Sequence, residues 1–274
     1  ALLKFVKFVQ FVALLKFVKF VQFVALLFLC AAPVACAPQP LTVTRQPVHI
    51  RLVVSDACSG LLDELTRAYH RARPWVTFQV AVYNDEVARE RLLSGGADGG
   101  AFIWLEDPAT LWATLLVSDA VALVVHPEVP IEDLTLDQAR ELLRGRIGEW
   151  PDGTPVQVVS REKGAGTRAV VQAVVMGPHS LTLTAQVVVS DASLLATVSR
   201  TPGAIGYVPA SRVGEGVRPL KIEGLAPAPD PNYPLTYPVL LATVGEPTGE
   251  LREWLQWALG PQGQAIAEQA LQRK

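Results

Sequence analysis

The sequence predicts an α/β fold built from mainly parallel sheets flanked by helices. Four consecutive segments have the pattern strand, helix, strand, helix, at residues 49–55, 59–73, 75–83 and 86–93. The strands are rich in β-branched residues, the helices carry apolar residues at helical spacing, and Pro74 ends the first helix. Strands that alternate with helices indicate a parallel sheet whose connections cover its faces.

The rest of the chain continues this alternation. Further strands are expected at 118–126, 156–159, 186–189, 203–208, 220–222 and 237–243. Further helices are expected at 135–144, 169–176 and 192–199. Two closing amphipathic helices are predicted from apolar residues at helical spacing, namely Leu251, Trp254, Leu255 and Ala258, then Ile266, Ala267, Ala270 and Leu271. In such sheets ligands bind outside the carboxyl ends of the strands.

The first 36 residues are typical of an export signal. Residues 1–12 recur identically as 13–24, and Lys16 and Lys19 supply positive charge before the apolar run 20–34. The tandem copy is too local and too apolar for a solenoid repeat. We therefore assign 1–36 to an export signal that contains a duplicated segment, and the proline-rich 37–47 to a tether.

The signal ends in Pro33-Val34-Ala35-Cys36, which resembles the lipobox of bacterial lipoproteins. Ala35 fits the position before the lipidated cysteine, whereas Pro33 stands where leucine is usual. Lipidation of Cys36, plain cleavage near Ala35 and an uncleaved anchor are the three alternatives. Each of them places the folded part outside the cytoplasm.

Charge and cysteine usage narrow the function classes. The chain has 24 basic and 26 acidic residues, and loss of the four signal lysines leaves 20 basic residues and a net charge of −6. Nucleic-acid binding needs a basic face, so this class is excluded. Of the three cysteines, Cys30 and Cys36 belong to the signal, which leaves Cys58 as a structural residue without a disulfide partner.

The segment 160–168, SREKGAGTR, is the strongest candidate for a site. It links a strand to a helix, and the first N–H groups of a helix can hold an anion. Two glycines, Gly164 and Gly166, allow the backbone to approach such an anion, and Thr167 adds a hydroxyl group. Arg161 and Arg168 supply guanidinium groups that pair with oxyanions. The alternative is an ordinary strand–turn–helix connection with solvated arginines.

The order of several motifs resembles the phosphate-binding proteins that serve ABC importers, within the type II periplasmic-binding superfamily. Segment 160–168 is similar to that family's R-x-x-G-S-G-T-R loop. Weaker similarities follow in the family's order at 134–135, 145–150, 202–208, 237–243 and 254–263. The resemblance implies a two-lobed clamp joined by hinge strands, with lobe I at 48–120 plus 236–274 and lobe II at 121–235.

The resemblance also implies site residues. Arg161 matches the phosphate-pairing arginine, and Gly164, Ala165, Gly166 and Thr167 match the loop, with Ala165 where the family has serine.

On the first lobe, Ser55, Asp56 and Ala57 stand for the small polar turn after the first strand. Two stretches depart from the family. Its serine-glycine turn is here Asn84-Asp85-Glu86, which brings acid near the cleft, and its D-x-G-x-S-D stretch is here 98–104, with an apolar, aromatic end.

The leading hypothesis is an exported solute-binding protein that captures phosphate or a related oxyanion for ABC permease subunits, without a cofactor or metal. One alternative is an organic anion held by Arg161 against Phe102, Trp104 and Trp112. Another is a signalling or scaffold module that transports nothing. An enzyme is not expected, because the chain lacks G-x-S-x-G and H-E-x-x-H motifs and its four histidines are scattered.

Overall fold

The structure, a computed structural model, describes residues 46–272 apart from the side chain of Pro108. The described residues belong to one compact unit, Arg45–Lys274. The predicted export signal, Cys36 and nearly all of the predicted tether lie outside them. Among the described helices, none has the length and apolarity that a membrane crossing requires.

The described strands form a nine-stranded mixed sheet with the order β2-β1-β3-β11-β4-β8-β6-β7, and β9 also pairs with β4. We call the first part half-sheet A: β1 (Val48–Ser55), β2 (Val76–Tyr83), β3 (Gly99–Phe102), β11 (Thr236–Thr243) and the part of β4 (Trp112–Val125) that pairs with β11. Half-sheet B comprises the end of β4 with β6 (Gln157–Arg161), β7 (Gln186–Val188), β8 (Ala204–Pro209) and β9 (Arg218–Pro219). Separately, β5 (Asp133–Leu134) pairs with β10 (Lys221–Ile222).

Seven described α-helices accompany the strands: α2 (Ser59–Ala72), α3 (Asp85–Leu93), α4 (Leu136–Leu143), α5 (Gly166–Val171), α6 (Asp191–Val198), α7 (Gly249–Leu259) and α8 (Pro261–Gln272). Short helical turns are η1 (Asp56–Cys58), η2 (Pro108–Thr110), η3 (Gln172–Met176) and η4 (Ala210–Arg212). The predicted helix at 169–176 is therefore corrected: an α-helical part begins at Gly166 and continues into a π-helical turn, η3.

Two strand predictions need correction. The strand expected at 118–126 is β4, and it begins earlier, at Trp112, because residues 112–117 pair antiparallel with β11. Within this strand the carboxylate of Asp119 accepts from Ser211 and Tyr237. The second is β3, a strand that was not expected from the sequence and that begins with two glycines. A Cβ at Gly100 would lie 2.8 Å from the carbonyl oxygen of Val53, so the close approach of β1 selects glycine there.

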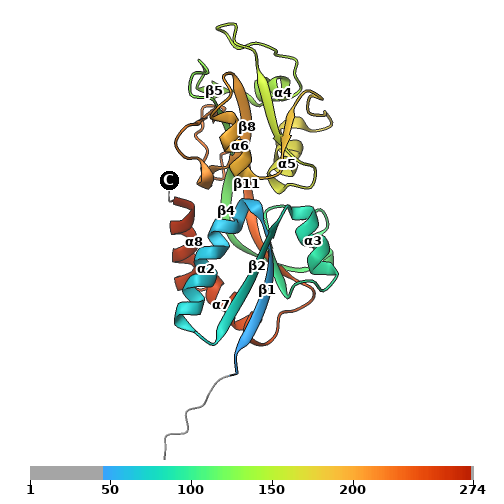
Figure 1. Cartoon of the computed structure of the whole chain (residues 1–274), viewed down its shortest axis with the longest axis vertical. Coiled ribbons are helices and arrows are strands. Elements are labelled where there is room, and N and C mark those ends of the chain that lie inside the picture. Colours follow the sequence, from blue (N-terminus) through green and yellow to red (C-terminus); the bar gives the residue numbers. More distant parts are fainter. Residues whose placement is uncertain (1–45, 273–274) are drawn as a thin grey trace, which may run out of the picture. The chain divides into compact units, whose positions relative to one another are not determined.

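Half-sheet A is covered on both faces, as the alternation of side chains in β1 requires. Leu52 and Val54 pack into a core cluster that includes residues of α2, α7 and α8. Between them, Val53 points to the opposite face and packs with Ala88 and Leu92 of α3. Figure 1 shows α2 and α8 side by side and α3 away from them.

Half-sheet B has the same arrangement. In β6, Val158 packs with Val170 on the face that α5 covers, and Val159 packs with Leu194 and Val198 of α6 on the other. The two half-sheets share the long strand β4, whose first part pairs with β11 and whose end pairs with β8. The lobe boundaries at 120 and 235 stay a prediction.

The carboxyl ends of the parallel strands position the site. In half-sheet A, β1 and β2 end in register at Ser55 and Tyr83, and β3 runs parallel beside β1. In half-sheet B, β6 and β7 end in register at Arg161 and Val188. Hydrogen bonds join the segments that follow these two sets of strand ends, as detailed below.

Candidate functional site

The carboxylate of Asp85 lies where donors from both half-sheets converge. Asp85 is the first residue of α3 and is only 4% exposed. Its Oδ1 accepts from the backbone N–H groups of Ile103 at 2.9 Å and Trp104 at 3.1 Å. Its Oδ2 accepts from Ser55 Oγ at 2.6 Å and from the N–H of Gly166, across the two half-sheets, at 2.8 Å. We call these four donors the Asp85 seat.

The Asp85 seat contains no charged donor. Burial raises the pKa of the Asp85 carboxyl, and the hydrogen bonds from Ser55, Ile103, Trp104 and Gly166 oppose that rise. Neutral N–H and O–H groups aimed at one buried carboxylate are the chemistry that proteins use to hold oxyanions. The seat therefore has the composition of an anion site, filled by a side chain of the same protein.

Gly164 and Gly166 allow the two half-sheets to approach closely at this point. A Cβ on Gly166 would lie 2.5 Å from Asp85 Oδ2 and 2.4 Å from the Ile103 side chain. A Cβ on Gly164, whose φ is +92°, would lie 2.5 Å from the carboxylate of Glu86. In addition, the Glu86 N–H donates to the carbonyl of Gly164 at 3.1 Å. Because these two residues have no side chain, the first residues of α3 can pack directly against them.

Arg161, at the end of β6, has every N–H directed to a protein acceptor. The side chain is 2% exposed, although a guanidinium has five N–H groups to satisfy. Its Nε and one terminal nitrogen donate to Glu162 at 3.1 and 3.2 Å, and Val189 O accepts at 3.3 Å. The other terminal nitrogen donates to Asp56 at 3.0 Å and to Asp191.

Burial and the charges around Arg161 shift the pKa values of Arg161 and Asp191. Burial lowers the pKa of Arg161, but the hydrogen bond to Glu162 and the charges of Asp191, Glu162 and Asp56 outweigh it and raise the pKa. Burial raises the pKa of Asp191 to about 6, with Arg161 opposing and the charge of Asp56 adding to the rise. Asp191 Oδ2 is buried without a hydrogen-bond partner among the described residues, which is consistent with this direction.

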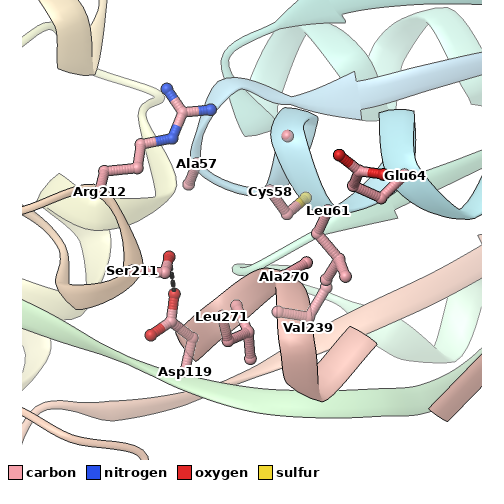
Figure 2. Close-up of a pocket in the computed structure, with 11 residues that line it drawn as sticks. Ala57, Cys58, Leu61, Glu64, Asp119, Ser211, Arg212, Val239, Ala270 and Leu271 are labelled. Atoms are coloured by element: carbon pink, nitrogen blue, oxygen red, sulfur yellow. Dashed lines mark hydrogen bonds between the residues drawn. The ribbon is translucent and has the colours of Figure 1, made fainter. Parts of the chain in front are cut away.

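A second arginine, Arg212 of η4, also contacts the carboxylate of Asp56. It donates to Asp56 Oδ1 at 3.4 Å, to the Asp56 carbonyl and to Ser59 Oγ at 2.6 Å. Figure 2 shows its guanidinium close to the segment that carries Ala57. Asp56 is therefore held by two arginines, and the N–H of Asp191 adds a bond of 2.8 Å.

Ala57 lies apart from the Asp85 seat. It lines a pocket of about 150 Å³, with Cys58, Asp119 and Ser211 among the other lining residues (Figure 2). Ser211 donates to Asp119 at 2.7 Å. Cys58 is a buried free cysteine, and burial raises the pKa of its thiol well above the usual value, which disfavours a reactive thiolate.

The remaining predicted loop residues lie around the seat in different roles. Thr167 is buried, and its Oγ1 has no hydrogen-bond partner among the described residues. Ala165 is the N-cap residue of α5 and supplies no side-chain cap. Arg168 donates to the backbone carbonyl of Arg161 at 2.9 Å. Asn84 caps α3 through the Val87 N–H at 2.9 Å.

A larger pocket of about 450 Å³ adjoins the seat on the side of α3. Its lining includes Trp104, Arg89, Lys163 and Arg168. Phe102, the second aromatic residue proposed for an organic-anion wall, is fully buried in the core with Val53 and Leu92 and does not line this pocket. Thus one of the three aromatic residues in that hypothesis, Trp104, is at the pocket.

Sequence reasoning found the segments of the site but missed its pairings. It placed Ser55, Arg161 and Gly166 together, and the structure brings them together around two carboxylates. It missed Asp191 and Arg212 as partners of Arg161 and Asp56. An acidic residue in the first turn of a helix, which Asp191 is, has an ordinary explanation in helix capping.

Comparisons with known proteins identify a family and relatives for this chain. The family model described as a PBP superfamily domain matches residues 42–262. The phosphate-binding protein PstS of Bacillus subtilis (strain 168) is 27% identical over 221 residues, which cover 74% of this chain and 72% of PstS.

Two solved structures have the same fold. A putative phosphate ABC transporter substrate-binding protein with bound phosphate from Clostridium perfringens has a TM-score of 0.77 at 24% identity, covering 81% of this chain and 97% of its own. An ABC-type phosphate transport receptor from Vibrio cholerae has a TM-score of 0.68 at 22% identity, covering 81% and 98%. Together with the family match, they confirm the predicted α/β periplasmic-binding fold.

Proposed function

The chain belongs to the PBP superfamily, and from this premise we propose that it is a solute-binding protein that captures phosphate or a related oxyanion for an ABC importer. The sequence similarity to PstS and the fold shared with two phosphate-transport binding proteins support this choice of ligand. The proposal describes a binding protein rather than an enzyme.

The observation that carries the proposal is the convergence of neutral donors from both half-sheets on one carboxylate. Ser55, Ile103 and Trp104 supply three donors from half-sheet A, and Gly166 supplies one from half-sheet B. A site built from both sides of a clamp is completed only when the two sides meet, which couples anion binding to closure. The donors therefore suit the capture of an oxyanion between two moving parts.

Thr167 adds a fifth group on the half-sheet B side. Its hydroxyl is buried without a partner among the described residues, and an unsatisfied buried polar group costs about 1–3 kcal/mol. An oxyanion beside Gly166 would accept from this hydroxyl. Arg161 would contact the ligand only by exchanging one of its present acceptors, which are Asp56, Asp191, Glu162 and the Val189 carbonyl.

We place the mature protein on the outer face of the cell membrane or in the periplasm. The similarity to PstS supports an extracytoplasmic location and permease subunits as partners. Lipidation of Cys36 would then anchor the domain through the tether at 37–47. Mass spectrometry of the membrane fraction would distinguish a lipidated Cys36 from simple cleavage near Ala35.

A second candidate ligand is an organic anion. The pocket of about 450 Å³ beside Trp104 has the size of a small-molecule site, and Lys163 and Arg168 supply positive charge there. A phosphate ester or carboxylate could place its acidic group toward Gly166 and its organic part against Trp104. A calorimetric titration that compares inorganic anions with an organic phosphate distinguishes the two ligand classes.

The test is calorimetric titration of the mature domain with phosphate, sulfate, molybdate and an organic phosphate. The informative variant is Thr167→Val, which keeps the side-chain shape but removes a hydroxyl that has no hydrogen-bond partner within residues 46–272. We expect it to retain the stability of the wild type and to weaken oxyanion binding about tenfold, the effect of one lost hydrogen bond.

Thr197→Val is the matched control, because Thr197 lies in α6 and its hydroxyl donates to the Ser193 carbonyl at 2.8 Å. It should leave affinity unchanged. Absence of heat with all four anions, in wild type and variants alike, would contradict the oxyanion proposal.

A further inference from the structure

We propose that Asp85 is a tethered anion that occupies the oxyanion position of this site, so that a free oxyanion binds only after the Asp85 side chain leaves. This inference rests on the proposed function and adds a specificity-determining residue to it. The residue competes with the ligand from within the protein.

The first step is the completeness of the bonding at Asp85. Each of its two oxygens accepts two hydrogen bonds, at distances between 2.6 and 3.1 Å. The donors are neutral, and the carboxylate has no hydrogen bond or ion pair to a lysine or arginine among the described residues. A carboxylate placed only to neutralise an arginine would look different, as Asp56 between Arg161 and Arg212 demonstrates.

The second step is the absence of room for another ligand atom at the cross-sheet contact. The Gly166 N–H reaches Asp85 Oδ2 at 2.8 Å, and even a Cβ built on Gly166 would lie 2.5 Å from that oxygen. While Asp85 Oδ2 accepts from the Gly166 N–H, a phosphate oxygen cannot take the same position on that donor. The ligand and Asp85 therefore use the Gly166 donor in turn.

The third step is electrostatic. The segments around the seat already carry Glu86 on α3, and Glu162 accepts from Asn84 at 3.3 Å across the two half-sheets. An incoming oxyanion beside an ionised Asp85 would place two like charges in a buried site, and each would disfavour the ionised form of the other. Exchange of one anion for the other avoids this conflict.

These steps give Asp85 a defined effect on affinity. When the binding-competent form is a small fraction of the molecules, the apparent Kd is the intrinsic Kd divided by that fraction. If Asp85 is seated in about 90–99% of molecules, its removal tightens the apparent Kd about 10- to 100-fold. Asp85 would thus set the concentration at which this protein responds to its ligand.

The experiment compares wild type, Asp85→Ala and Asp63→Ala by calorimetric titration with inorganic phosphate and by thermal unfolding with added acetate. Asp63→Ala is the matched control: the residue is exposed on α2, and the substitution removes the same charge from a helix. Acetate supplies the missing carboxylate, so it reports on the emptied seat independently of phosphate.

We expect Asp85→Ala to bind phosphate about tenfold or more tightly than wild type. We also expect acetate to raise its unfolding temperature, with little effect on wild type or on Asp63→Ala. If Asp85→Ala proves unstable, Asp85→Ser keeps a polar residue at the start of α3 and is measured in the same way.

The outcomes separate the two proposals. Wild-type binding of phosphate that Asp85→Ala does not improve would overturn the tethered-anion proposal and leave the proposed function intact. Acetate stabilisation of Asp85→Ala without phosphate binding by any variant would support the tethered anion and contradict phosphate as the ligand. A variant that responds to neither acetate nor phosphate would overturn the tethered anion.

Discussion

Asp56 and Asp85 both lie just beyond strands of half-sheet A and both accept hydrogen bonds from half-sheet B, but their partners differ in charge. Asp56 pairs with Arg161 and Arg212. Asp85 meets only backbone N–H groups and the hydroxyl of Ser55. Two carboxylates in neighbouring positions are thus held by different physical means.

The difference indicates which contact is structural and which is exchangeable. Removal of Arg161 from the Asp56 cluster takes the hydrogen-bond donor away from the fully buried Asp191 carboxylate, which is strongly unfavourable. Removal of Asp85 leaves four neutral donors that another anion can satisfy. The charged cluster should therefore determine stability, and the neutral seat should determine ligand binding.

The largest expected effect comes from Arg161→Ala. Asp191 is fully buried and Asp56 is mostly buried, and both would lose their shared guanidinium partner. Breaking a buried ion pair costs about 3–5 kcal/mol, so we expect a loss of that size in the free energy of unfolding, measured by urea denaturation.

Arg67→Ala is the control for this prediction. Arg67 is exposed and pairs with Glu64 at 3.6 Å in the same helix, a type of pair worth about 0.3–0.5 kcal/mol. A loss below about 1 kcal/mol for Arg161→Ala would show that the cluster is not structural.

The next prediction is that Asp191 makes the free energy of unfolding depend on pH. Its folded-state pKa is raised from 3.8 to about 6, so its stabilising contribution is complete at low pH and is lost as pH rises through about 6. The stability of wild type relative to Asp191→Asn should therefore fall between about pH 4 and pH 7, by about 1–3 kcal/mol.

Urea denaturation of both proteins across that range measures this difference. Because both proteins keep Asp85 and Asp119, whose pKa values are also raised by burial, their contributions cancel to first order. A difference that stays constant or increases with pH would contradict the assignment to Asp191.

The smallest effect tests the close approach at the seat. In Gly166→Ala the new Cβ would meet Ile103 at 2.4 Å and Asp85 at 2.5 Å, and overpacking of this kind costs about 1–3 kcal/mol. Gly148→Ala is the control, because a Cβ there would meet no atom within 4 Å. Equal thermal stability of the two variants would mean that the half-sheets do not need this contact.

Much of the fold could be predicted because its determinants are local. The strand that precedes α2 and the capped helix after Thr135 follow from apolar periodicity and capping residues. β3 could not be predicted, since its glycines are poor strand formers and only the approach of β1 requires them. The start of β4 was missed because residues 112–117 pair with β11, which lies far away in the sequence.

The candidate site shows the same limit. The composition of residues 160–168 predicts a loop that can bind an anion, and similarity to a known family strengthens this prediction. Whether Arg161 is available for a ligand depends on Asp56, 105 positions away, and on Asp191, 30 positions away. No local pattern reports a pairing of that kind.

Periodicity and glycine placement act over short distances, so the alternation of strands and helices and the loop at 160–168 could be predicted from the sequence, and the export signal stays a prediction. Only the tertiary structure decided what fills the loop. From the sequence, Asp85 was expected only to bring acid near the cleft, as part of the turn Asn84-Asp85-Glu86. Its burial against Gly166, 81 positions away, is what turns it into an occupant of the anion seat.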